Sequence, residues 1–273
     1  MECDSVAIKL TLGNSKGGVG KTIISNLLSF SLIDQGKRVL LVDLDPQANT
    51  TMINRLKYDF SEEVPTIIDG INQKDLSSVL IELQEGLYLL PGDARTVEME
   101  RLVPAKNPVL FLSKFIEKIE GQFDFIFYDV PPTAYSTYLN NALGASDYFV
   151  ILTEATKQSF SGISQFYSAA MAIQNHFNSK LDCLGIIINR REKDIANFKL
   201  LDETFEISAD EMFFETMIPA RTRIGKYSEH GLYNFSKSIY GLDKWDEEVK
   251  KCINVLLDEM LSRIGGVKVE ATK

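Results

Sequence analysis

A glycine-rich segment with two lysines and a threonine has the most specific chemical pattern in the sequence. It reads Asn14-Ser15-Lys16-Gly17-Gly18-Val19-Gly20-Lys21-Thr22. The apolar run at 6–12 before it predicts a strand, and the spacing at 22–36 after it predicts a helix closed by Gly36. Such a loop between a strand and a helix is where α/β sheets bind nucleotide phosphates, because glycines let backbone N–H groups face the phosphate oxygens. We expect Lys21 to reach the β- and γ-phosphates and the Thr22 hydroxyl to bind Mg²⁺.

Carboxylates stand at the ends of two further predicted strands. The strand at 37–45 ends in Asp43 and Asp45, and the strand at 123–132 carries Asp129 before two prolines. Ligands of parallel sheets bind at the carboxyl ends of the strands, so these side chains are expected beside the glycine-rich loop. A carboxylate there can position or deprotonate a water for attack on the γ-phosphate, and Asp129 is expected to hold Mg²⁺ through water.

The rest of the pattern predicts the elements that position these residues. Further strands are expected at 86–93, 147–153, 184–190 and 211–219, further helices at 108–120, 158–177, 195–205 and 244–264, and a mixed, partly irregular stretch at 46–84. This alternation indicates an α/β fold with a mainly parallel twisted sheet and helices on both faces. Because no linker or internal repeat divides the chain, residues 1–273 are predicted to form a single domain with a C-terminal helix at about 244–264.

Composition excludes several classes of protein. Of the 273 residues, 45% are hydrophobic and 25% are charged, which rules out a disordered, collagen-like or coiled-coil chain. The net charge of -9 argues against a chain that coats nucleic acid along its whole length, although binding depends on local Lys and Arg. Cys3, Cys183 and Cys252 have no spacing typical of a disulfide framework or zinc site, and His176 and His230 are too few for a histidine metal site. Without a secretory signal or an apolar run of ~18 residues, a cytoplasmic protein with no membrane partner is expected.

The glycine-rich loop departs from the pattern GxxxxGK[ST], because Ser15 stands where the first glycine would fall and a second lysine, Lys16, follows it. The stretch KGGVGKT resembles the deviant Walker A motif KGGxGKT, and the chain is identified as a member of the ParA/MinD family of P-loop ATPases. The resemblance implies ATP and Mg²⁺ as cofactors. It also implies a homodimer that forms on ATP binding, in which Lys16 reaches across to the phosphates of the partner copy. Lys16 and Lys21 are then both expected to act in catalysis.

Two later stretches resemble motifs of the same family. Asp43-Leu44-Asp45-Pro46-Gln47-Ala48-Asn49 resembles the switch I signature DxDPQxN, and Phe125–Pro132 resembles a Walker B strand that runs into switch II. By this match Asp45 is the residue expected to support hydrolysis and to lie close to Mg²⁺, with Asp43 in a supporting role. The implied metal-binding residues are Thr22, Asp45 and Asp129.

A third stretch, Ile218-Pro219-Ala220-Arg221 with Ser228-Glu229-His230-Gly231, resembles the IPR…EAPSHGKP stretch of ParA/Soj proteins, although Ala220 and Tyr233 depart from it. In the family this region and the strand-end residue at Asn189 line the adenine. An alternative for Asn189 is an ordinary capping or turn residue. The complete set of nucleotide-binding residues expected here is Gly17, Gly18, Val19, Gly20, Lys21, Thr22, Ile23, Asn189, Pro219 and Arg221.

The resemblance implies an ATP-dependent DNA-partitioning ATPase that binds double-stranded DNA non-specifically as a dimer and associates with the nucleoid in its ATP state. Slow hydrolysis, stimulated by a ParB-like centromere-binding partner, would release it. The residues considered for DNA contact are Arg190, Arg191, Lys193, Arg221, Arg223 and Lys226. The alternative for these residues is a solvated charged loop, since Glu192 and Asp194 lie among them.

Other members of the superfamily offer competing interpretations. A MinD-like membrane ATPase would need a basic amphipathic C-terminal helix, whereas the helix predicted here mixes acidic and basic residues. A metal-cluster carrier would need clustered cysteines, which the sequence lacks. A small-molecule ligase or synthetase is disfavoured by the Asp-Pro-Gln switch, and a regulatory protein that binds ATP with little hydrolysis is also open.

Overall fold

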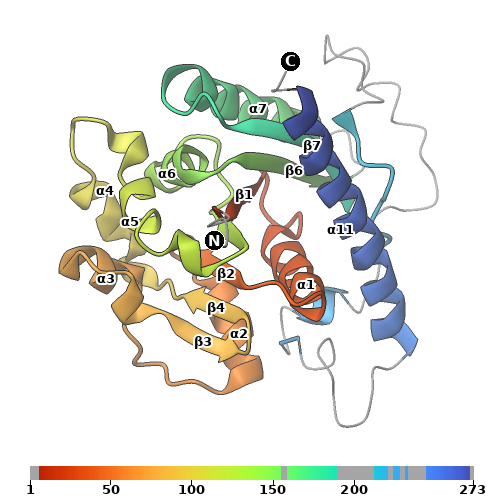
Figure 1. Cartoon of the computed structure of the whole chain (residues 1–273), viewed down its shortest axis with the longest axis horizontal. Coiled ribbons are helices and arrows are strands. Elements are labelled where there is room, and N and C mark those ends of the chain that lie inside the picture. The colour runs from red at the N-terminus through yellow and green to blue at the C-terminus, as the bar shows by residue number, and fades with distance from the viewer. Residues whose placement is uncertain are drawn as a thin grey trace, which may run out of the picture.

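A seven-stranded sheet forms the centre of the computed structural model (Figure 1). The described residues are 6–154, 159–189, 212–220, 224–227, 231–232 and 244–270. The strands are β1 (Ile8–Gly13), β2 (Val39–Asp43), β3 (Ile81–Gln84), β4 (Leu87–Leu90), β5 (Phe125–Asp129), β6 (Tyr148–Glu154) and β7 (Asp182–Asn189). Every residue of β2 and β5 is buried, as expected of strands that helices cover on both faces.

The order of the strands explains why the functional residues meet. The order is β3-β4-β2-β5-β1-β6-β7, and every neighbouring pair is parallel except the edge pair β3–β4. The register pairs Asp129 of β5 with Asp43 of β2 on one side and with Leu12 of β1 on the other. Two carboxylates and the loop that follows β1 therefore lie at the same edge of the sheet, and the predicted mainly parallel α/β fold is confirmed.

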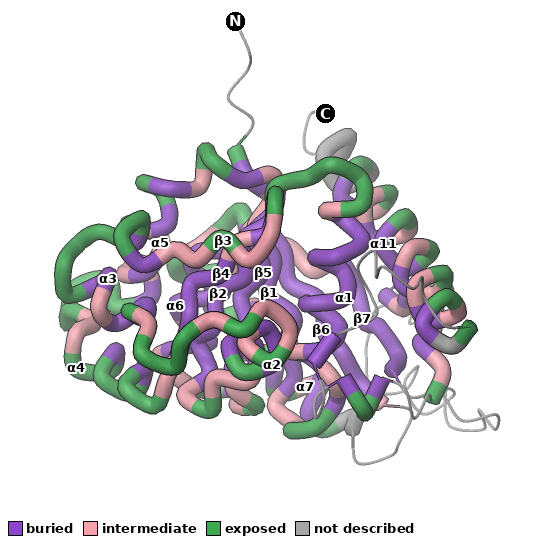
Figure 2. Tube along the Cα trace, turned by 90° about the horizontal axis from the view of Figure 1, so that it is seen from below, coloured by how far each residue is buried: buried purple, intermediate pink, exposed green. Residues whose placement is uncertain are grey.

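Helices form a layer on each face of the sheet. The α-helices in the described part of the chain are α1 (Lys21–Asp34), α2 (Asn49–Tyr58), α3 (Ile67–Gln73), α4 (Met99–Leu102), α5 (Ser113–Ile116), α6 (Thr137–Ala145), α7 (Ser159–His176) and α11 (Lys244–Glu270). One core packs side chains of α1 and α11 against the sheet, and the other packs side chains of α3, α5, α6 and α7 against the opposite face. Figure 2 shows the buried strands between α1 and α11 on one side and α6 on the other.

Helix α1 is buried around much of its circumference because it lies between the sheet and α11. Ile24, Leu27 and Leu28 are completely buried. The helix begins directly after Gly20 and is followed by Gly36, and both glycines have positive φ angles of 96° and 77° that other residues rarely adopt. The helix expected at 22–36 is therefore confirmed, and its N-terminus points at the glycine-rich loop.

The C-terminal helix α11 packs on the domain. It was expected at about 244–264 and extends to Glu270. Ile253, Leu256 and Leu257 are completely buried, and Lys250 forms an ion pair with Asp34 of α1. No helix within the described residues is long and apolar enough to cross a membrane.

Two predicted elements are wrong. The segment at 108–120 is a short 3₁₀ turn followed by the single turn α5, because the Leu112 N–H donates to the Asn141 side chain at 3.0 Å instead of to a helical carbonyl. At 211–219 the described residues form no strand, although Phe213 makes a bridge to Ile186 of β7 and the N–H groups of Phe214 and Ile218 donate to carbonyls of β7. Between these two bonds, the N–H groups of Glu215 and Thr216 donate to the Glu259 carboxylate of α11, so the pairing with β7 is interrupted there. The helix predicted at 195–205 lies outside the described residues.

Candidate functional site

The glycine-rich loop has a backbone that requires glycine at two positions. Gly18 and Gly20 have φ angles of 78° and 96°, in the left-handed region. A Cβ atom at Gly20 would lie 2.4 Å from Nδ2 of Asn189, so the loop approaches the end of β7 closely. The loop leads into α1 at Lys21, where the first N–H groups of the helix have no helical partner and favour an anion.

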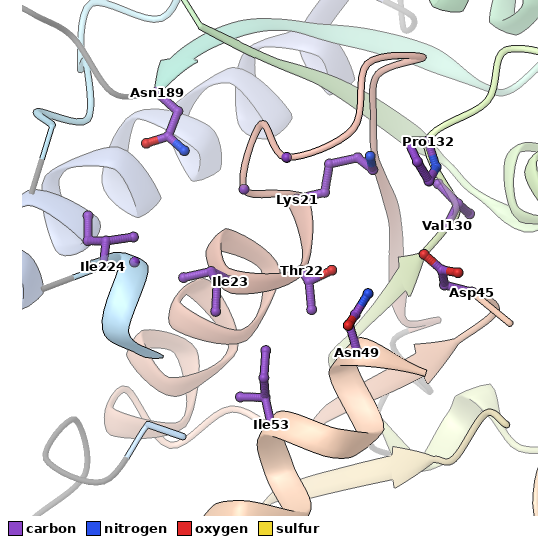
Figure 3. A pocket seen from close by; sticks show the side chains of 13 residues that line it. Lys21, Thr22, Ile23, Asp45, Asn49, Ile53, Val130, Pro132, Asn189 and Ile224 are labelled. Atoms are coloured by element: carbon purple, nitrogen blue, oxygen red, sulfur yellow. The ribbon is translucent and has the colours of Figure 1, made fainter. Parts of the chain in front are cut away.

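A cavity of about 280 Å³ opens against this loop (Figure 3). It is lined by Gly18, Gly20, Lys21, Thr22, Ile23, Asp45, Asn49, Ile53, Val130, Pro132, Asn189, Ile224 and Gly225. The lining includes seven of the residues that the sequence predicts for the site, which come from the loop, α1, the end of β2 and the end of β7. Val19 and Asp129 are buried behind this surface.

Lys21 places a lysine side chain on the wall of the cavity. Its side chain is buried, and Nζ lies 3.5 Å from the backbone oxygen of Asn14. Burial lowers the pKa of Lys21, while the negative charges of Asp129 and Asp45 act in the opposite direction. A lysine in this setting is poorly solvated, and an anion such as a phosphate in the cavity would compensate its charge.

The two aspartates after β2 have different surroundings. Asp45 lines the cavity, and its Oδ1 accepts the Gln47 N–H at 2.9 Å, which fixes the turn after the strand. Asp43 is fully buried, and its Oδ2 accepts the N–H and the hydroxyl of Thr51 at 2.8 and 2.7 Å. Burial, reinforced by the neighbouring Asp129 charge, raises the pKa of Asp43 to about 8. Asp43 therefore anchors α2, whereas Asp45 faces the place where a reacting group would bind.

The oxygen atoms beside Lys21 suit Mg²⁺. The Thr22 hydroxyl donates to Oδ2 of Asp129 at 2.8 Å, so a hydroxyl and a carboxylate of the kind Mg²⁺ prefers lie together. Among the described residues no group of three or more His, Cys, Asp or Glu side chains is arranged to hold a metal. The Thr22 hydroxyl and the Asp129 carboxylate fit an ion that takes its other oxygens from waters and substrate phosphates, as Mg²⁺ does in nucleotide sites.

Lys16 has a partner that the sequence did not reveal. Its Nζ forms an ion pair with Glu154 at the end of β6, with 2.9 Å between Nζ and Oε2, and both side chains are partly exposed. The Lys16 N–H also donates to Oδ1 of Asn14, whose Nδ2 in turn donates to the Leu152 carbonyl of β6. The first half of the loop is thus fastened to β6. Glu154 carries no motif, and only the pairing of β6 beside β1 brings it to Lys16.

Asn189 is completely buried at the end of β7, and its Nδ2 donates to the Val19 carbonyl at 2.7 Å. This contact ties the tip of the glycine-rich loop to the sheet. The side chain also lines the cavity, so contact with a nucleotide remains a prediction. The bond to Val19 indicates that Asn189 also positions the glycine-rich loop.

Asn189→Ala is expected to weaken ATP binding about tenfold, because the Val19 carbonyl loses its donor inside the protein and the loop is less firmly held. Isothermal titration calorimetry with Mg-ATP measures the change. Asn178→Ala is the matched control, since Asn178 also donates to backbone carbonyls, at Leu143 and Ser146, outside the cavity. Equal ATP affinities of Asn189→Ala and the unmodified chain would contradict this role.

Only some of the remaining predicted site residues lie in the described part of the chain. Pro219 is not among the residues that line the cavity, whereas Ile224 and Gly225, a few residues later, are. Lys226 is exposed. The other predicted residues of this region, Arg190, Arg191, Lys193, Arg221 and Arg223, lie outside the described residues.

The fold and the site define a nucleotide-binding protein of the P-loop type, and comparison with known proteins agrees. The model of the AAA domain family AAA_31 matches residues 7–183. The chain belongs to this family, and its relatives place it with the ParA/MinD-type partitioning ATPases.

Relatives extend over most of the chain. The sporulation initiation inhibitor protein Soj of Bacillus subtilis is 29% identical over 232 residues, which cover 81% of this chain and 88% of Soj. The chromosome-partitioning ATPase Soj of Thermus thermophilus is 28% identical over 227 residues, 82% of this chain and 85% of that protein. These relationships support nucleotide hydrolysis as the general activity.

Solved structures share the fold. Cobyrinic acid a,c-diamide synthase from Mycobacterium smegmatis with bound ATP analog and magnesium superposes with a TM-score of 0.68 at 27% identity, over 82% of this chain and 92% of the synthase. A single-residue variant of Cyanothece McdA in its ATP complex has a TM-score of 0.77 at 20% identity, over 94% of this chain and 97% of McdA, which concerns the fold alone. The predicted cofactors, ATP and Mg²⁺, agree with the contents of the synthase structure.

Proposed function

We propose that this chain is an ATP-dependent DNA-partitioning ATPase that alternates between an ATP-bound dimer on DNA and a released, ADP-bound form. The observation that carries the proposal is the convergence of Lys21, Thr22 and Asp45 on one cavity at the carboxyl edge of the sheet. The partitioning activity of the Thermus relative and the ATP analog and magnesium of the synthase structure support it.

The site residues divide the work of ATP hydrolysis. The N–H groups of Gly17–Gly20 and the Lys21 ammonium bind the phosphates, and Thr22 with Asp129 holds Mg²⁺, which neutralises phosphate charge when bound. Asp45 lies on the cavity wall, where its carboxylate accepts a proton of the attacking water. The water oxygen bonds to the γ-phosphorus as the bond to the β,γ-bridging oxygen breaks, which yields ADP and phosphate.

Lys16 acts between two copies of the chain. In the ATP-bound dimer its ammonium leaves Glu154 and contacts the phosphates of the partner copy, so that two nucleotides lie between the two loops. Supplied from the second copy, this charge compensates the negative charge that develops in the transition state. Hydrolysis without a second copy is therefore slow.

This role of Lys16 is tested by measuring dimer formation with analytical ultracentrifugation in the presence of Mg-ATP. The measurement uses the Asp45→Ala variant, which is expected to retain bound ATP. We expect a dimer with ATP and a monomer with ADP. Adding Lys16→Ala is expected to leave ATP bound and the chain monomeric. A dimer of equal strength in Lys16→Ala and its parent would contradict the proposal.

Glu154→Gln is expected to strengthen the ATP-dependent dimer up to about 30-fold, because the Lys16 of each of the two copies no longer has to leave an ion pair and each partly exposed pair contributes about 1 kcal/mol or less. The dimer dissociation constant, measured in the same Asp45→Ala background, gives the effect. Glu120→Gln is the matched control, since it breaks the comparable pair with Lys9, 2.8 Å long, outside the cavity. A weaker dimer in Glu154→Gln would mean that Glu154 supports the dimer.

DNA binding follows from the dimer in this proposal. The basic residues around β7 and after Pro219, among them the exposed Lys226, are proposed to form one positive face when two copies associate. A ParB-like partner with a basic segment would stimulate hydrolysis and release the complex from the nucleoid. Membrane attachment through the C-terminal helix is less favoured, because the apolar side chains Ile253, Leu256 and Leu257 of α11 are buried on the domain.

A further inference from the structure

A chain of buried hydrogen bonds connects α2 to Asp129. Thr50 is completely buried, and its hydroxyl donates to Oδ2 of Asp129 at 2.8 Å, the oxygen that also accepts the Thr22 hydroxyl. Nδ2 of Asn26 donates to the Thr22 carbonyl and to Oγ1 of Thr50. Nδ2 of Asn54 donates to Oδ1 of Asn26 at 2.7 Å. Side chains of α1 and α2 thus form one network that ends on a carboxylate of β5.

This network is unusual for a protein interior. Asn26 and Asn54 are completely buried, and within the described residues Oδ1 of Asn54 has no hydrogen-bond partner. Buried polar groups without partners are rare and costly, so apolar residues would fill the space between α1 and α2 more stably. The network therefore suggests a purpose other than stability. It reaches the functional site through the bond from Asn26 to the Thr22 backbone carbonyl and through the bond from Thr50 to the Asp129 carboxylate, and only the second of these holds a side chain of the site.

We propose that Thr50 is a positioning residue of the magnesium site. The inference rests on the proposed function, in which Thr22 and Asp129 hold Mg²⁺. Because Thr22 is itself a metal ligand there, Thr50 is the donor that fixes the Asp129 carboxylate without being shared with the ion. Asn49 and Ile53 of the same helix line the cavity, so the bond also holds this wall and the segment after Asp45 in place.

The substitution Thr50→Val tests this role, because it keeps the shape of the side chain and removes the hydroxyl. Binding of a fluorescent ADP analogue is measured first in EDTA and then across a Mg²⁺ titration. We expect Thr50→Val to bind the analogue in EDTA within about twofold of the unmodified chain and to need about tenfold more Mg²⁺ for half-maximal tightening. Thr50→Ser keeps the hydroxyl and is expected to restore the original Mg²⁺ dependence.

Thr11→Val is the matched control, because Thr11 is also completely buried and its hydroxyl bonds to Ser146 at 2.8 Å, outside the cavity. It should leave the Mg²⁺ titration unchanged. A normal Mg²⁺ titration in Thr50→Val, together with an abolished one in Asp129→Asn, would overturn the role of Thr50 and leave the proposed site intact. A normal titration in Asp129→Asn as well would overturn the magnesium site itself, and with it both proposals.

Discussion

Lys21→Ala is expected to reduce ATP affinity at least about 100-fold, or ~2.7 kcal/mol, and to abolish measurable hydrolysis. Its ammonium is buried on the cavity wall, and burial already lowers its pKa, so no water shell competes strongly with a phosphate for it. Calorimetric titration with Mg-ATP and a phosphate-release assay give the two quantities. Loss of affinity and loss of turnover should occur together, since a chain that binds no ATP hydrolyses none.

Lys9→Ala is the matched control for this substitution. Lys9 lies in β1, the strand that leads into the glycine-rich loop before Lys21. Its side chain is largely buried and forms an ion pair with Glu120, but it does not line the cavity. Its removal should lower the melting temperature and leave ATP affinity within about twofold of the original. ATP affinity retained in Lys21→Ala, or lost equally in both variants, would contradict the assignment of Lys21.

Asp45→Ala is expected to slow ATP hydrolysis about 100-fold or more while ATP affinity stays within about threefold. The reason is that the Asp45 carboxylate faces the cavity as the acceptor of a water proton, whereas the phosphates are bound by the loop and Lys21. Single-turnover phosphate release, measured beside equilibrium ATP binding, separates the two effects. A parallel loss of binding and hydrolysis would instead make Asp45 mainly a metal ligand.

The control for Asp45→Ala is Asp93→Ala. Asp93 also accepts the N–H two residues later, at 2.8 Å from Arg95, as Asp45 does from Gln47, so both variants lose the same kind of turn bond. Asp93 does not line the cavity. Hydrolysis should therefore be unaffected in Asp93→Ala, and a similar slowing there would assign the effect to a disturbed turn.

The parallel sheet and the loop were predictable because their signals are local. The apolar runs of β1, β2 and β5, the glycines at 18 and 20 and the Lys-Thr pair at the start of α1 each fix their own backbone, and the parallel arrangement then brings the strand ends together. The helices α2 and α3 were not predicted in the mixed stretch at 46–84. Helix α2 buries the polar residues Thr50, Thr51 and Asn54, so its buried face lacks the apolar period on which prediction depends.

The contacts made by the site residues were less predictable than their identities. Glu154 meets Lys16 because β6 pairs with β1, and Asn189 meets Val19 because β7 ends beside the loop. The segment at 108–120 has a helical period, but the Asn141 side chain takes up one of its N–H groups. Such bonds join residues far apart in sequence, so the residue pattern within one segment cannot predict them.

Retention on non-specific double-stranded DNA distinguishes a DNA-partitioning ATPase from an ATPase that acts elsewhere. The unmodified chain and Asp45→Ala are applied to DNA-coated beads with Mg-ATP, with Mg-ADP and without nucleotide, each at two salt concentrations. We expect retention with Mg-ATP alone, stronger in Asp45→Ala and weaker at the higher salt, because phosphate contacts release counterions. Absence of retention in every state, including Asp45→Ala with Mg-ATP, would contradict a DNA-partitioning ATPase.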